Sequence, residues 1–206
     1  MIYDISPPFS PELAVWPGDA PLEREIKLDM SKGDNLTLSG IRSTVHLGSH
    51  ADAPSHYGRD AEAIHEPDLS LSLGPCQVIH VSIERCESIT PVHLTMEITQ
   101  SRVLFATGTY PDPHHFNEDF ASLTPELVTH CHEKGVRLIG IDTPSVDPFH
   151  SKDLPSHLTF LKHDMAILEG LRLSDVPEGV YELIALPLKL VGFDASPVRA
   201  VLRALP

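Results

Sequence analysis

The sequence has little of what several common protein classes require. Its 206 residues include three cysteines, Cys76, Cys86 and Cys131, and no two of them form a C-x-x-C pair. A disulfide framework or a zinc site built from thiolates is therefore not expected. No apolar run reaches the ~18–20 residues that a transmembrane helix needs. The N-terminus carries an aspartate and several prolines and lacks the pattern of a secretion signal, so we expect a cytoplasmic protein.

Basic residues are also scarce. Fifteen Lys and Arg stand against 29 Asp and Glu, which gives a formal net charge of −14. Because broad binding to nucleic-acid phosphates needs clustered positive charge, nucleic acid is not an expected partner. Glycine-rich phosphate loops and the G-x-S-x-G motif of serine hydrolases are absent as well. What the chain does contain is 13 histidines, and imidazole is the commonest metal ligand in proteins.

The order of the predicted elements indicates one α/β domain over residues 1–206. Strands predominate in the N-terminal half, and strands alternate with helices in the C-terminal half. The segments predicted as strands are 2–5, 35–46, 75–83, 102–107, 136–142 and 181–191. Helices are predicted between Thr124, which suits the N-cap, and Gly135, around His157, and from Ser196 towards the C-terminus.

Four potential metal ligands lie within eleven residues, in the segment HLGSHADAPSH. They are His46, His50, Asp52 and His56. All four positions are even, so in an extended strand their side chains would point to one face. A straight strand would hold the first and last of them about 33 Å apart. That distance is too long for one ion, whose bonds to its ligands are ~2 Å long.

The segment must therefore curl, and Gly48 and Pro54 are residues that permit or impose a bend. Three protein ligands with an open position are the usual arrangement of a catalytic zinc. The first three residues of the set would supply them. His56 would then be either a fourth ligand or a nearby general base, and an imidazole beyond the ligand set favours catalysis over a purely structural site.

Other residues are candidates for the same site. Glu169 is the only acid in the apolar run MAILEGL, where an unpaired charge would be costly unless an ion satisfied it; an exposed edge position is the alternative. His157 and His163 are six residues apart, so one helix would point them in different directions, and the residues alone do not choose between them. Trp16 is the only tryptophan and lies in a Pro/Gly-rich loop. There it either plugs the edge of the core or forms an aromatic wall for a planar substrate.

The segment HLGSHADAPSH resembles the H-x-G-[ST]-H-x-D-x-P-x-H signature of the metal-dependent cyclase-like hydrolases. Further segments resemble one branch of that family, the bacterial kynurenine formamidases, and together they cover nearly the whole chain. These segments are YDISPPFSPELAVWPGD, LGPCQVIHV, GVRLIGIDTPSVDP, HDMAILEGL and YELIALPLKLVGFDASPVRAVLRAL. The resemblance implies a swivelling β/β/α fold with a mixed-sheet core and flanking helices, and a homodimer. It also implies two divalent metal ions per subunit, with zinc as the first choice and manganese as the second.

The resemblance also implies a role for each candidate residue. The implied metal ligands are His46, His50, Asp52, His157 and Glu169, with Asp52 and Glu169 bridging both ions. His56 would be the proton donor and acceptor, and Trp16 would contact the substrate. The implied reaction is the hydrolysis of N-formyl-L-kynurenine to L-kynurenine and formate by a metal-activated water. Two alternatives remain: a ring-opening amidase of the isatin hydrolase type, and a metal-stabilised binding protein without catalytic activity.

Overall fold

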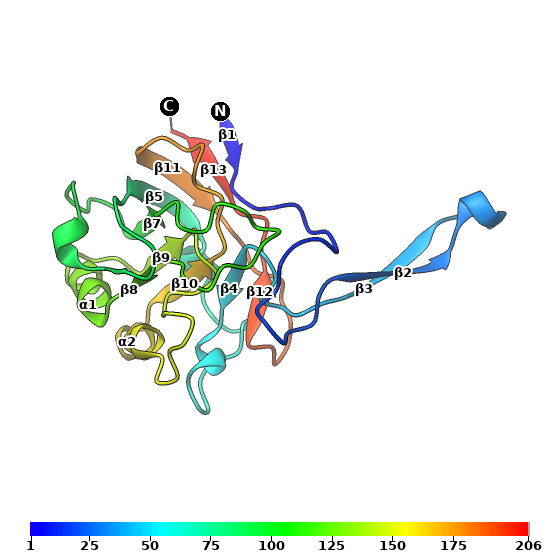
Figure 1. Cartoon of the computed structure of the whole chain (residues 1–206), viewed down its shortest axis with the longest axis horizontal. Helices are drawn as coiled ribbons and strands as arrows, with labels where there is room; N and C mark the ends of the chain where they lie inside the picture. Colours follow the sequence, from blue (N-terminus) through cyan, green and yellow to red (C-terminus); the bar gives the residue numbers. More distant parts are fainter. Residues whose placement is uncertain (206) are drawn as a thin grey trace.

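The computed structural model describes residues 1–205, and its largest element is a curled sheet of nine strands (Figure 1). In spatial order the strands are β1 (Ile2–Asp4), β13 (Val201–Ala204), β11 (Gly179–Ile184), β5 (Leu73–His80), β7 (Arg102–Ala106), β9 (Leu138–Ile141), β10 (Ala166–Glu169), β4 (His50–Asp52) and β12 (Ala195–Pro197). Three neighbouring pairs are parallel, namely β5–β7, β7–β9 and β9–β10, and the other pairs of the sheet are antiparallel. The predicted mixed α/β class is confirmed.

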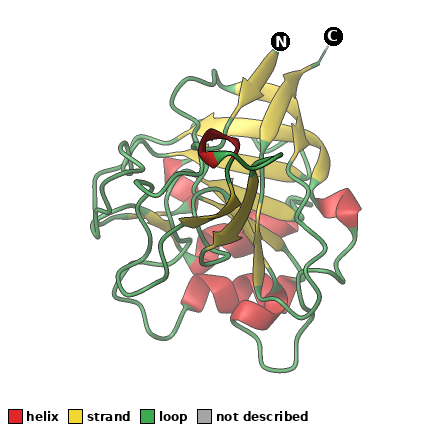
Figure 2. Cartoon of the chain, turned by 90° about the vertical axis from the view of Figure 1, so that its right-hand side faces the viewer, coloured by secondary structure: helices red, strands yellow, loops and turns green. Residues whose placement is uncertain are grey.

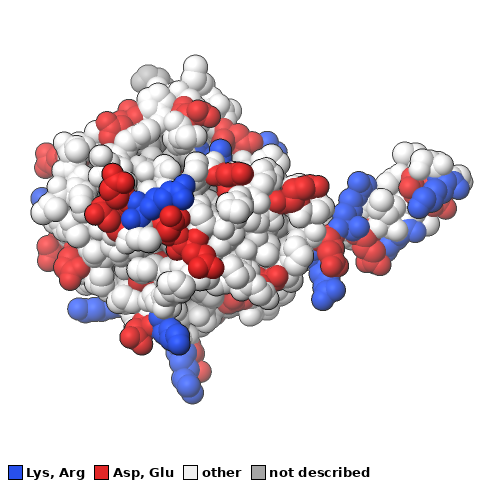
Figure 3. Space-filling model, in the orientation of Figure 1, with Lys and Arg blue, Asp and Glu red and all other residues white. Residues whose placement is uncertain are grey.

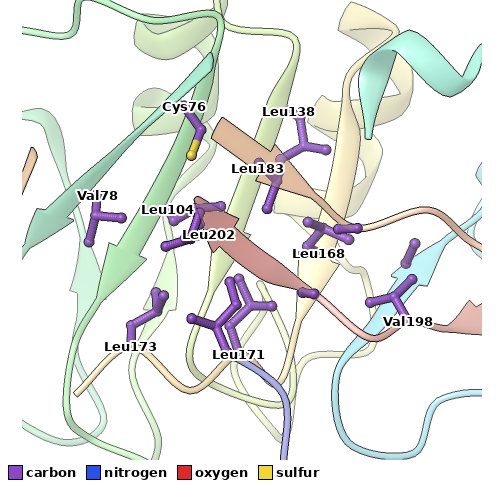
Figure 4. Close-up of a cluster of buried hydrophobic side chains, with 14 of the residues drawn as sticks. Cys76, Val78, Leu104, Leu138, Leu168, Leu171, Leu173, Leu183, Val198 and Leu202 are labelled. Carbon is purple, nitrogen blue, oxygen red and sulfur yellow. The ribbon is translucent and has the colours of Figure 1, made fainter. Parts of the chain in front are cut away.

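Two hydrophobic clusters lie on opposite faces of the sheet, and alternate residues of the central strands contribute to one or the other. In β7, Val103 and Phe105 belong to the cluster on the helix side, whereas Leu104 belongs to the opposite cluster. That opposite cluster, shown in Figure 4, also contains Leu202 of β13 and Val198, which follows β12. Since β13 and β12 lie near the two ends of the strand order, the sheet must curl for both to reach one cluster.

Two α-helices, α1 (Pro125–Glu133) and α2 (Pro155–His163), pack against each other on one side of the sheet (Figures 1 and 2). Helix α1 begins as the sequence predicts. The Thr124 side chain accepts a hydrogen bond from the third backbone amide of the helix, and a proline fills the first position, where a missing N–H costs nothing. The buried Phe160 of α2 joins the cluster on this side of the sheet.

The helix predicted from Ser196 towards the C-terminus is wrong. Instead, β12 pairs with β4, and β13 lies between β1 and β11. The burial pattern gives the reason: Val198, Ala200 and Leu202 are buried, and the residues between them are exposed or half-buried. This period of two matches a strand, and pairing on both sides of β13 outweighs the helix propensity of the segment.

Two strands, β2 (Glu23–Leu28) and β3 (Leu38–Arg42), form a hairpin that projects from the rest of the molecule (Figure 1). We call this hairpin, residues 23–42, the arm. Strand β3 accounts for the middle of the predicted strand 35–46, and the sequence patterns did not indicate its partner β2. At the tip Asp29 caps a short 3-10 turn, and Gly33 closes that turn with a left-handed φ of 99°.

The remaining elements are short. They are the parallel pair β6 (Ser88–Ile89) and β8 (Ser122–Leu123), and the 3-10 turns η1 (Met30–Lys32), η2 (Pro54–His56), η3 (Leu69–Leu71) and η4 (Pro91–His93). Within residues 1–205, neither α-helix has the length and apolarity needed to span a membrane.

Candidate metal centre

The strand pair β4–β10 brings the predicted ligands together. In this antiparallel pair His50 lies directly opposite Glu169, and Asp52 projects two residues further along β4. His46 comes from the turn before β4, and His157 from the first turn of α2. Residues that are far apart in the sequence therefore meet beside β4.

In this cluster the imidazole nitrogens approach both carboxylates. Nε2 of His50 lies 3.2 Å from Oε2 of Glu169 and 3.5 Å from Oδ1 of Asp52. Nδ1 of His46 lies 3.2 Å from the same Oδ1 of Asp52. Nε2 of His157 lies 3.4 Å from Oδ2 of Asp52 and 3.6 Å from Oε1 of Glu169. Each carboxylate thus turns one oxygen towards His50 and the other towards His157.

Several buried atoms of the cluster have no hydrogen-bond partner among residues 1–205. They include Nε2 of His50 and both carboxylate oxygens of Asp52. Nδ1 of His50 donates to the carbonyl oxygen of Gly48 at 2.9 Å, so the lone pair of Nε2 faces the carboxylates. Buried lone pairs that face anions are unfavourable unless a cation lies between them. An imidazole oriented through its other nitrogen is also the usual geometry of a metal ligand. The residues present therefore fit a divalent cation.

The electrostatics of the cluster lead to the same conclusion. Burial opposes a charge on His46, but Asp52 and Asp194 raise its pKa to about 9. Burial also opposes a charge on His157, but Asp147 and Asp52 raise its pKa to about 10. For Asp52 burial acts to raise the pKa, and the nearby His157 and His46 hold it well below its usual range. The cluster strongly favours positive charge.

One aspartate that the sequence patterns did not single out orients His157. Asp147 accepts hydrogen bonds from the backbone amides of Ser156 and His157 at the start of α2. It also accepts from Nδ1 of His157 at 2.7 Å. Asp147 therefore caps the helix and turns Nε2 of His157 towards the carboxylates.

A second such aspartate, Asp194, connects two of the predicted imidazoles. Its Oδ2 lies 3.0 Å from Nε2 of His46 and 3.4 Å from Nδ1 of His56. The backbone carbonyl of Asp194 accepts from the amide of Ala53, so the pairing of β12 with β4 fixes its position. A single aspartate in a loop carries no pattern of its own, and only the fold reveals this contact.

His56 lies in η2 beside the first predicted ligand, and its ring centroid is 4.2 Å from that of His46. Two sets of possible ligand atoms each lie within 4.8 Å of one another: His46, Asp52 and His56 form one set, and His50, Asp52 and Glu169 form the other. The geometry is compatible with both predicted roles of His56, fourth ligand and proton-transfer group.

His163 lies elsewhere. Its ring stacks on that of His132, with centroids 4.2 Å apart, where α1 and α2 meet. Of the two histidines that the residues alone could not separate, the structure brings His157 to the cluster and leaves His163 outside it.

A cavity of about 300 Å³ opens onto the cluster, and Trp16 forms part of its wall. The indole also packs against Phe149, with ring centroids 4.9 Å apart, and against Phe116 at 5.4 Å. Trp16 thus lies on the cavity wall, one of its two predicted placements, and packs on neighbouring aromatic rings there. Its contact with a substrate stays a prediction.

Comparisons with known proteins agree with this fold and cluster. A family model described as "Putative cyclase" matches residues 3–148. A solved structure of a "predicted metal-dependent hydrolase from Bacillus stearothermophilus" is 31% identical, with a TM-score of 0.81, over 98% of this chain and 97% of that one. Another, a "potential metal-dependent hydrolase with cyclase activity", is 29% identical, with a TM-score of 0.83, over 98% and 96%.

The fold and the ligand cluster fit the class to which these two structures are assigned, the metal-dependent hydrolases of the cyclase-like type. The chain belongs to the cyclase family, whose model covers well over half of its length. Isatin hydrolase A from Labrenzia aggregata shares the fold, with a TM-score of 0.84 and 24% identity over 98% of this chain and 93% of that one. The resemblance seen in the sequence is confirmed at the level of the family, and the kynurenine formamidase branch stays a prediction.

Proposed function

We propose that the protein hydrolyses N-formyl-L-kynurenine to L-kynurenine and formate. The observation that carries the proposal is the set of unpartnered buried atoms of His50 and Asp52 beside a cavity with an aromatic wall. Hydrolysis of an aryl formamide needs an activated water, a surface for the aryl ring and a group that protonates the departing amine. The chain offers residues for each of these requirements.

The proposed cofactor is a pair of divalent ions, zinc first and manganese as the alternative. His46 and His50 would hold one ion and His157 the other, with Asp52 and Glu169 shared between them. The support is that the two oxygens of each carboxylate face different imidazoles. Divalent ions bound there lower the pKa of a water molecule and polarise a carbonyl oxygen.

His56 is the proposed proton-transfer group. Its Nδ1 faces Asp194, which leaves Nε2 for the cavity that His56 helps to line. Nε2 takes a proton from the water whose oxygen bonds to the formyl carbon, and gives that proton to the amide nitrogen as the C–N bond breaks. The products are the aryl amine and formic acid, which ionises to formate. Trp16 packs against the aryl ring and holds it in place during this transfer.

We also propose that the protein is a homodimer and that the arm is part of its interface. An isolated two-stranded hairpin is at best marginally stable in water. The arm nevertheless exposes five apolar side chains, namely Ile26, Met30, Leu36, Leu38 and Ile41. It also carries four acidic and four basic residues (Figure 3), so it is neutral in a chain of net charge −14 and can approach the acidic body of a second copy without overall repulsion.

The proposed activity is tested by a comparison of two substrates. Protein reconstituted with zinc or with manganese is mixed with N-formyl-L-kynurenine or with isatin, with and without a chelator. We expect kynurenine to form from the first substrate and the chelator to abolish its formation. Faster turnover of isatin would identify a ring-opening amidase instead. A fully metal-loaded protein that turns over neither substrate would indicate a metal-stabilised binding protein.

A further inference from the structure

The wall of the cavity carries one permanently charged cation. Among residues 1–205, Arg172 is the only Lys or Arg that lines it, whereas Asp19, Asp142 and Glu169 contribute acidic groups. The chain as a whole has about half as many basic as acidic residues. A guanidinium in the wall beside the candidate metal centre therefore limits which ligands fit there.

The backbone fixes the position of Arg172 relative to the cluster. Strand β10 ends at Glu169, and Gly170 turns the chain with a left-handed φ of 66°. A Cβ atom at this glycine would clash with the carbonyl oxygen of Gly48, so the turn packs directly on the ligand segment. The amide of Arg172 then donates to the carbonyl oxygen of Ile5 at 2.8 Å.

The protein uses only part of the hydrogen-bonding capacity of this side chain. Nη1 of Arg172 donates to the carbonyl oxygen of Pro111 at 3.0 Å. Within residues 1–205 no carboxylate forms an ion pair with it, whereas Arg85, Arg199 and Arg203 each have one. A guanidinium has five N–H donors in a planar fork that matches a carboxylate. The donors that remain are therefore suited to an anionic group in the cavity.

We propose that Arg172 is a carboxylate-binding subsite that selects aromatic amides carrying a carboxylate. The inference rests on the proposed function and deepens it. N-formyl-L-kynurenine has its formamide on the aryl ring and its α-carboxylate at the end of the side chain. With the formamide at the cluster and the carboxylate at Arg172, one cavity holds both ends of the molecule. A neutral aryl formamide is held at one end only.

Kinetic selectivity tests the subsite. The ratio of kcat/KM for N-formyl-L-kynurenine to that for formanilide, which has no carboxylate, is measured for the metal-loaded wild type and for Arg172→Gln. We expect the ratio to fall roughly 10- to 100-fold, as for a lost hydrogen bond to a charged group. Arg172→Lys, which keeps the charge and loses the fork, should lie between the two. An unchanged ratio would overturn the proposal.

Binding separates this inference from the proposed activity. Calorimetry compares L-kynurenine with kynuramine, its analogue without the carboxylate. Wild type should prefer L-kynurenine, and Arg172→Gln should lose that preference, even if the protein does not hydrolyse N-formyl-L-kynurenine. The control Arg85→Gln removes the same charge outside the cavity and should keep the preference. Equal affinity of the wild type for both ligands would contradict the subsite whatever the activity.

Discussion

The metal-ligand cluster and the arm are neighbours in the sequence, since only three residues separate β3 from His46, yet they leave opposite kinds of group unsatisfied. In the cluster, His50 and Asp52 are 2% and 6% exposed, and within the described chain neither Nε2 of His50 nor the carboxylate oxygens of Asp52 have a hydrogen-bond partner. In the arm, Ile41 is apolar and 78% exposed. A buried polar group without a partner and an exposed apolar group both cost stability.

Both regions contain groups that a second molecule or an ion would stabilise. The cluster is suited to cations, which would convert its facing lone pairs and carboxylates into a set of ligands. The arm is suited to a second protein surface, which would cover its apolar residues. Each region contains groups that a folded chain normally pairs or buries, and its proposed partner would pair or bury them.

The largest effect is expected from Glu169→Gln. The amide removes one of the two carboxylates and introduces N–H donors that cannot bind a cation, so metal content and activity should both be lost. At a zinc concentration 1,000 times the Kd, binding stabilises the wild type by about 4.1 kcal/mol. At ~2–4 °C per kcal/mol for a chain of this size, zinc should raise the Tm of the wild type by roughly 10 °C. The variant should show no such rise.

Metal analysis by inductively coupled plasma and thermal denaturation check this expectation. Glu133→Gln makes the same change at an exposed position on α1 and should keep the metal and the shift in Tm. Full metal content in Glu169→Gln would rule out the assignment of Glu169 as a ligand.

A smaller effect, confined to turnover, is expected from His56→Ala. Loss of a general acid–base group typically lowers kcat by about 10²–10⁴-fold, and metal content should stay at the wild-type level. Asp194→Asn should lower kcat by roughly 10–100-fold, because it weakens the contacts that position both His56 and the proposed ligand His46 while both imidazoles remain. If His56→Ala instead loses metal, His56 is a ligand and the proton comes from another group.

The sequence predicted the fold class and several elements because their signals are local. The N-cap and proline of α1 lie within its own first turn, and the apolar stretch 136–142 contains β9. The predicted C-terminal helix failed because the residues of β13 are strand residues only when β1 and β11 lie beside them. Strand β2 has no buried residue, so it lacked the hydrophobic pattern on which a prediction depends.

The candidate site likewise combines features that the local sequence predicts with features that only tertiary contacts determine. The spacing of the set from His46 to His56 is local and predicted a metal site, and the curl it required is seen in the bend from β4 into η2. The position of Glu169 opposite His50 depends on the register of two strands more than one hundred residues apart. Asp147 and Asp194 act through tertiary contacts alone, so nothing in their neighbouring residues indicated their roles.

Substitutions in the arm should have the smallest effect on catalysis, and they should alter the assembly of the protein instead. Ile26 and Ile41 lie on the same face, since Ile26 pairs with Ser39 and Ile41 with Arg24. The double substitution Ile26→Thr and Ile41→Thr keeps β-branched residues and removes apolar surface. In a two-fold dimer each change counts twice, so at about 1 kcal/mol per side chain the Kd of the dimer should rise roughly 10²–10³-fold.

Sedimentation velocity over a range of concentrations measures this change, and metal content should remain at the wild-type level because the cluster lies outside the arm. Ile2→Thr provides the matched control, since Ile2 is 68% exposed on β1 of the body and should leave the dimer intact. A wild type that stays monomeric at all concentrations would refute the homodimer. A double variant that associates as tightly as the wild type would place the interface elsewhere. The arm would then expose its apolar residues for another reason, and its comparison with the cluster would no longer hold.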